Sequence, residues 1–158
     1  MISFTKADLD MVQDPHNDTL LVTLKIGDWQ VRRILIDHGS SCDIMYVRCY
    51  KELDLHPDDL EQSDNPMVGF NGTLTWPLGA TNLEVQAGSK KVKMKFAVID
   101  TPFPYNIILG RPWLHVMRVV PSMLHQLLRF PTDQGIEEVR RGPSTSENFH
   151  YGGNEVHL

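Results

Sequence analysis

One strand-ending motif constrains this chain more than any other feature, and it consists of Asp37, His38, Gly39, Ser40 and Ser41. The apolar, largely β-branched residues Ile34 to Ile36 come directly before it and favour a buried strand. A glycine two positions after the aspartate permits a tight turn, so the strand would present one carboxylate at the floor of a cleft. We therefore interpret Asp37 as a candidate catalytic acid and residues 38–41 as its active-site loop.

Hydrolysis by such an acid needs a second carboxylate, because two carboxylates that share one proton divide the acid and base roles. The chain holds only one Asp-x-Gly-Ser-Ser motif. The second carboxylate must then come from another copy of the chain, which predicts a homodimer with an Asp37 dyad on its two-fold axis. One Asp37 would stay protonated while the other activates a water molecule, and Ser40 is expected to donate a hydrogen bond to the outer carboxylate oxygen.

A second segment repeats the strand-turn-helix pattern and supports the first. The apolar residues Ile108 and Leu109 lead into Gly110 and Arg111, and Pro112 marks a helix start. We interpret Ile108, Leu109, Gly110 and Arg111 as support for the cleft around Asp37.

The chain resembles the retropepsin-type aspartic protease domain of plant gypsy-class long-terminal-repeat retrotransposon polyproteins. The resemblance runs from about Pro15 to Arg140, and its specific part is the order and spacing of Asp-x-Gly-Ser-Ser and Ile-Leu-Gly-Arg-Pro-Trp-Leu. It implies an all-β fold with one or two short helices, a retropepsin-like half-barrel that closes as a homodimer. It also implies an aspartic endopeptidase that cleaves polyprotein or peptide substrates. His38 departs from the family, which generally has Thr or Ser there.

The segment from Met67 to Thr75 is rich in apolar residues around two glycines. An ordinary β-turn between strands would account for this composition. By resemblance to retropepsins the segment would be the flap, a hairpin that closes over a bound peptide. The flap residues are then Val68, Gly69, Phe70, Asn71 and Gly72.

The other patterns predict mostly strands. Two runs, 19–26 and 29–36, flank a Gly27-Asp28 turn, and a second hairpin joins 82–86 to 92–100. Ser40 or Ser41 could cap a helix over 43–53, with Asp43 favouring its positive end. A terminal strand is expected over 124–130.

Composition fits one domain and narrows the partners. The 158 residues are 41% hydrophobic and carry a net charge of −5, which gives no electrostatic reason for nucleic-acid or anionic-membrane binding. No apolar run approaches the length of a membrane span. The two cysteines are expected as reduced thiols, and no His or Cys spacing indicates a metal site or cofactor. A cytoplasmic location, or one inside retroelement particles, follows by default.

We divide the chain into a loosely ordered leader at 1–14, a protease domain at 15–140 and a disordered tail at 141–158. The alternative to an active protease is a catalytically silent retropepsin-like module that binds peptides or dimerises. A purely structural polyprotein segment is the third possibility.

Overall fold

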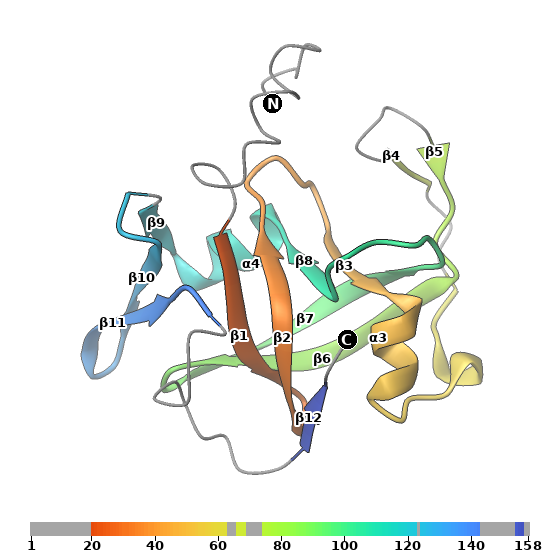
Figure 1. The fold of residues 1–158 in the computed structure, drawn as a ribbon, viewed down its shortest axis with the longest axis horizontal. Helices are drawn as coiled ribbons and strands as arrows, with labels where there is room; N and C mark the ends of the chain where they lie inside the picture. The colour runs from red at the N-terminus through yellow and green to blue at the C-terminus, as the bar shows by residue number, and fades with distance from the viewer. Residues whose placement is uncertain (1–19, 63–65, 69–73, 123, 143–153, 157–158) are drawn as a thin grey trace.

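The computed structural model describes residues 20–62, 66–68, 74–122, 124–142 and 154–156 (Figure 1). The predicted leader at 1–14 lies outside these residues. Within them, no helix is both long enough and apolar enough to span a membrane.

Strands dominate the fold, as the sequence predicted, and two short helices accompany them. The strands are β1 (Leu20–Ile26), β2 (Trp29–Ile36), β3 (Asp43–Tyr46), β4 (Met67–Val68), β5 (Leu74–Thr75), β6 (Gly79–Ala87), β7 (Lys90–Ile99), β8 (Ile107–Leu109), β9 (Val120–Ser122), β10 (Leu127–Thr132), β11 (Gly135–Arg140) and β12 (Asn154–Val156). The helical elements are α3 (Val47–Glu52), α4 (Arg111–Met117) and the 3₁₀ turn η1 (Pro57–Asp59).

The main sheet closes on itself. Its strand order is β1-β6-β7-β3-β8-β2-β12, and β1 also pairs with β2, so six strands form a ring and β12 is added at the edge of β2. The predicted hairpins are confirmed: β1 and β2 meet around Gly27, which has φ of 61°, and β6 pairs with β7. On β7 the lysines at 91, 93 and 95 are exposed and alternate with residues that face inward.

A β-bulge interrupts the β1–β2 hairpin. Val22 pairs with Ile34 and Leu24 pairs with Val31, so Thr23 alone stands opposite Arg32 and Arg33. Arg33 has the left-handed φ of 59°. Such a two-against-one bulge turns the backbone groups of the extra residue away from the ladder.

Asn106, just before β8, forms hydrogen bonds with the backbone carbonyl groups that the bulge turns away from the β1–β2 ladder. Its side-chain amide donates to the carbonyl oxygen of Arg32 at 2.6 Å, and its backbone N–H donates to that of Arg33 at 3.0 Å. Its own carbonyl accepts from the N–H of Tyr46 at 3.1 Å. This buried asparagine therefore joins β2, β3 and β8.

The core lies inside the ring of strands. Its largest fully buried side chains include Trp113 of α4, Tyr50 of α3 and Phe96 of β7. A separate three-stranded sheet, ordered β11-β10-β9, contributes Phe130 and Val139 to the same core. The expected terminal strand is thus β10, flanked by two strands that the sequence did not indicate.

Glu137 of β11 links this small sheet to the β6–β7 turn. Its carboxylate accepts from the backbone N–H of Ser89 at 2.8 Å, from the Ser89 hydroxyl, and from the Thr132 hydroxyl at 3.0 Å. These bonds, led by the Ser89 hydroxyl, lower the pKa of Glu137 from its usual value.

One expectation needs correction. The helix predicted over 43–53 begins only at Val47, because residues 43–46 form β3 between β7 and β8, and its N-cap is Tyr46 and not a serine. Within the predicted tail at 141–158, Asn154–Val156 form β12, which pairs in parallel with Trp29–Val31 of β2, and the division into leader, domain and tail stays a prediction. Strand pairing with an available sheet edge is a tertiary effect that local propensity does not encode.

Candidate active site

The turn after β2 holds Asp37 in place through its backbone. The N–H of Asp37 donates to the carbonyl oxygen of Leu109 at 3.0 Å, and the N–H of Ser40 donates back to the carbonyl of Asp37 at 3.2 Å. The N–H of Gly39 donates to Oδ1 of Asp37 at 2.9 Å. Asp37 is half-buried, whereas His38 and Gly39 are exposed. The carboxylate is therefore oriented by the turn and open to a partner or substrate.

Ser40 does not perform the role predicted for it. Its hydroxyl donates to the carbonyl oxygen of Cys42 at 2.6 Å, and not to Asp37. The exposed Ser41 lies beside Cys42, with 3.8 Å between Oγ and Sγ. Ser40 thus stabilises the turn itself, since a short hydroxyl side chain readily satisfies nearby backbone groups.

The second strand-turn-helix segment packs directly on this turn. Ile108 and Leu109 are fully buried in β8, and α4 starts at Arg111. The N–H of Arg111 donates to the carbonyl oxygen of Ser40 at 2.9 Å. At Gly110 a Cβ atom would lie 2.5 Å from the carbonyl oxygen of Cys42 and 2.6 Å from that of Ser40. Only glycine allows this approach, so the structure brings together the two motifs that the sequence singled out.

Asp43 is a site residue that the sequence placed at the start of a helix over 43–53, whereas it lies in β3 and bonds the residue before α4. It is 2% exposed, and its Oδ1 accepts the N–H of Gly110 at 2.8 Å, the residue before α4. Burial raises its pKa to about 6, against the opposing hydrogen bonds from the backbone of Gly110 and Trp113. An acid two residues past the Ser-Ser pair, in an apolar strand, was the available signal.

A second apolar cluster, which we call the outer cluster, lies beside the Asp37 turn and was missed in the sequence. It consists of Leu35, Ile44, Tyr46, Ile99, Phe103 and Ile108. Leu35 lies two residues before Asp37 and Ile108 two before Gly110, so their side chains follow the same strand faces as those turn residues. Tyr46 stacks on Phe103 with 4.6 Å between ring centroids. Burial, and then the negative charge of Asp37, raise the pKa of Tyr46 to about 12.

The predicted flap is described in part. Met67 pairs with Thr75 and Val68 with Leu74, forming the two-stranded β4–β5 ribbon. The remaining predicted flap residues, Gly69, Phe70, Asn71 and Gly72, lie outside the described residues. The ribbon and the turn after β2 both lie toward the upper side of the view in Figure 1.

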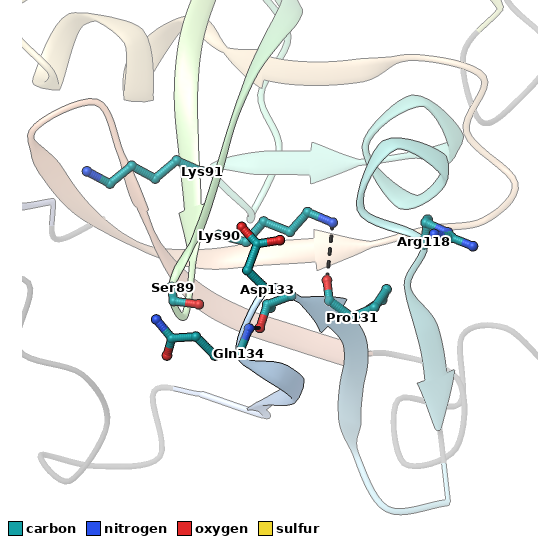
Figure 2. Close-up of a pocket in the computed structure, with 8 residues that line it drawn as sticks. Ser89, Lys90, Lys91, Arg118, Pro131, Asp133 and Gln134 are labelled. Carbon is teal, nitrogen blue, oxygen red and sulfur yellow. Dashed lines mark hydrogen bonds between the residues drawn. The ribbon is translucent and has the colours of Figure 1, made fainter.

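The described residues form a cavity apart from this site and no cluster that could hold a metal ion. Across the described ranges, no three His, Cys, Asp or Glu side chains gather where they could hold a metal ion. A cavity of about 520 Å³ lies between the β6–β7 and β10–β11 turns, and Lys90 there donates to the carbonyl oxygen of Pro131 at 3.2 Å. Figure 2 shows the residues that line it. None of the predicted site residues lines it.

Solved structures share this fold. The retroviral protease-like domain of Ddi1 from Leishmania major matches with a TM-score of 0.61 and 18% identity, over 79% of this chain and 94% of that one. EIAV protease in complex with the inhibitor HBY-793 matches with a TM-score of 0.53 and 19% identity, over 63% and 88%. A retropepsin-like aspartic protease from Rickettsia conorii matches with a TM-score of 0.51 and 15% identity, over 66% and 76%.

These similarities establish the class of fold, which is that of the retropepsin-like aspartic protease domains. The expectation of a mainly β, retropepsin-like fold is thereby confirmed. No family model matches the chain. No curated protein matches it either.

Proposed function

We propose that this protein is an aspartic endopeptidase that acts as a homodimer, with one Asp37 from each copy. The observation that carries the proposal is the seating of the Asp37 turn on β8, through the Asp37 N–H and the Leu109 carbonyl, within a retropepsin-like fold. A half-buried carboxylate at the end of a strand, whose hydrogen bond among the described residues comes from the N–H of Gly39, leaves room for a second carboxylate. The structurally similar EIAV protease was solved in complex with an inhibitor, which supports a ligand-binding role for this fold.

In the proposed mechanism the two Asp37 carboxylates lie about 3 Å apart and share one proton. The ionised one takes a proton from a water molecule, which attacks the peptide carbonyl carbon. The protonated one stabilises the developing oxyanion and passes a proton toward the leaving amine. The N–H of Gly39 stabilises the carboxylate that accepts it and fixes its orientation.

The outer cluster supports a substrate with apolar side chains next to the cleaved bond. Its half-buried members Leu35 and Ile44 stand on β2 and β3, the strands on either side of the Asp37 turn. Burying a substrate side chain there would stabilise the complex through the apolar area removed from water.

The resemblance noted in the sequence supports a finer proposal. The natural substrate would be a retroelement polyprotein of the plant gypsy class, cleaved in the cytoplasm or within retroelement particles. Release of fragments from the matching polyprotein, with no cleavage of an unrelated unfolded protein, is the expected result.

A fluorogenic apolar peptide assayed from pH 4 to 7 tests the activity. Asp37→Asn should abolish cleavage, because the amide cannot act as base. Asp54→Asn is the matched control, since Asp54 is exposed and its φ of 61° suits asparagine. Cleavage by Asp37→Asn within about tenfold of the wild type would contradict the assignment, because a factor of ten corresponds to only about 1.4 kcal/mol.

A mixing experiment tests the shared dyad. Equal amounts of wild-type and Asp37→Asn chains are mixed and allowed to exchange. The mixture should retain about half of the activity that the same amount of wild-type chain shows alone, because random C₂ pairing leaves fewer dimers with two aspartates. A protease that works as a monomer would keep its full activity in the same mixture.

His38 favours a second candidate, a catalytically silent module that dimerises or binds peptides. The imidazole is exposed in the turn, at a position where the resembled family generally has a hydroxyl. Recovery of cleavage in His38→Thr from an inactive wild type would identify such a module. Equal cleavage by both would favour the active protease.

A further inference from the structure

Asp43 carries a buried carboxyl group that the proposed chemistry leaves unexplained. The residue is 2% exposed, and within the described residues its Oδ2 is buried without a hydrogen-bond partner. It opens β3 and lies beside Phe96 of β7 in the strand register. A buried ionisable group in an apolar strand is unfavourable unless it makes a specific contact. The contacts here are the 2.8 Å hydrogen bond from the N–H of Gly110 and a hydrogen bond from the backbone of Trp113.

The bond from Gly110 belongs to a group of three hydrogen bonds, which we call the seam, made by the backbone of the consecutive residues 109–111. Leu109 accepts from Asp37 at 3.0 Å, Gly110 donates to Asp43 at 2.8 Å, and Arg111 donates to Ser40 at 2.9 Å. Asp43 provides the one side-chain atom among these links. Because the neighbouring carbonyl oxygens leave no room for a Cβ at Gly110, the seam has little freedom to shift without losing all three.

We propose that Asp43 is a positioning residue that seats the Asp37 turn on β8 and α4 by holding the N–H of Gly110. This inference rests on the proposed function where it concerns catalysis. The seating itself can be measured without any cleavage.

The protonation state of Asp43 should control the strength of the seam. The charged side chains on the elements packed against β3 are exposed, and they include Arg48 of α3, Lys95 of β7, and Arg111 and His115 of α4. The charged group of the turn is Asp37 itself. The pKa of Asp43, about 6, is therefore set by burial and by backbone hydrogen bonds. A carboxylate accepts the Gly110 N–H more strongly than a neutral acid does, but ionisation buries a charge in an apolar strand, and this burial is the larger effect. The closed seam should therefore be favoured in the neutral, more acidic form.

Backbone amide NMR on the full chain tests the seating. In the wild type, the amide signals of Gly110, Gly39 and Ser40 should titrate together with a midpoint near pH 6. They should do so equally in Asp37→Asn, which excludes Asp37 as the titrating group. Asp43→Asn keeps an oxygen acceptor for Gly110 but cannot ionise, so it should remove the titration. Persistence of the titration in Asp43→Asn, or movement of Gly110 alone, would overturn the proposal.

Kinetics test the consequence for catalysis. Asp43→Ala removes the acceptor of the Gly110 N–H and should lower kcat at least about tenfold with KM within about twofold, because the turn is displaced while the outer cluster keeps its place. Asp43→Asn should retain kcat near pH 5 and lose the decline that the wild type shows above about pH 6. A folded Asp43→Ala with unchanged kcat, or an unchanged pH profile in Asp43→Asn, contradicts the inference. If Asp43→Ala does not fold, the Asp43→Asn profile decides. An inactive wild type with the NMR titration intact would refute the proposed function and leave the seating established.

Discussion

Asp37 is bonded through its backbone N–H to the carbonyl oxygen of Leu109, at 3.0 Å. This bond continues the parallel pairing of β2 with β8, in which Ile36 stands beside Leu109. The position of the candidate catalytic residue is therefore fixed by main-chain contacts. Among the described residues, its side chain accepts one hydrogen bond, from the N–H of Gly39.

The melting temperature of Asp37→Asn should consequently stay close to that of the wild type, within roughly 3 °C, which corresponds to less than about 1 kcal/mol in a domain of this size. An asparagine oxygen can still accept from Gly39. Calorimetry alongside the cleavage assay checks this, and a large loss of stability would mean that lost activity reflects unfolding.

Gly110→Ala should destabilise the fold by up to about 3 kcal/mol, because the new methyl group would press on two backbone carbonyls that cannot swing aside. Gly27→Ala is the matched control: its Cβ would meet nothing within 4 Å, so its cost arises only from the φ of 61°, roughly 1 kcal/mol. Urea unfolding measures both. Equal losses in the two variants would show that the packing at Gly110 is not tight.

Asn106→Ala should cost about 1–3 kcal/mol, since it removes the buried amide that donates to Arg32 at 2.6 Å. Asn82→Ala provides the comparison. Asn82 is exposed and donates to Glu61 at 3.0 Å, so its loss should cost less than about 0.5 kcal/mol. Chemical denaturation of the two variants should separate them clearly, and similar values would contradict the linking role of Asn106.

The two cysteines should react at very different rates with a thiol reagent. Cys49 is fully buried, and burial, together with the charge of Glu52, raises its pKa to about 12. Cys42 is half-buried at the end of the active-site turn, and both thiols are free. Ellman's reagent should label one thiol rapidly in the native protein and two in denaturant. In Cys42→Ser, rapid labelling should disappear, and two rapidly labelled thiols in the native wild type would argue against this packing.

Acid should weaken the attachment of the β9–β11 sheet. The pKa of Glu137 is lowered in the folded chain, so its bonds contribute stability above its usual pKa and lose that contribution as the pH falls through the lowered value. Glu137→Gln should therefore show a smaller fall in melting temperature between pH 7 and pH 3 than the wild type. Glu84→Gln, which alters an exposed carboxylate on β6, should behave like the wild type.

Local patterns predicted the parts of this fold that depend on neighbours in the sequence. Both hairpins and the second strand-turn-helix segment, from β8 to α4, are confirmed, because alternation and glycine placement determine them. The helix expected from Asp43 failed because β7 and β8 offer strand partners that lie far away in the sequence. For the same reason the local motif misassigned Asp43, whose partner Gly110 becomes evident only when the two turns meet. Ser40 was misassigned because its hydroxyl bonds the nearby carbonyl oxygen of Cys42.

The bulge in β2 shows that the number of residues in a strand, and not only their type, can determine a contact. Val31 and Ile34 face the core opposite Leu24 and Val22, and a hairpin with one arginine fewer would keep both pairings. The extra residue is therefore not needed for alternation. What it supplies is a pair of carbonyl oxygens aimed at Asn106. Deleting either arginine would leave a regular hairpin without the two hydrogen bonds to Asn106, which precedes the strand leading to Gly110. A single insertion after the bulge would instead turn Ile34 and Ile36 outward.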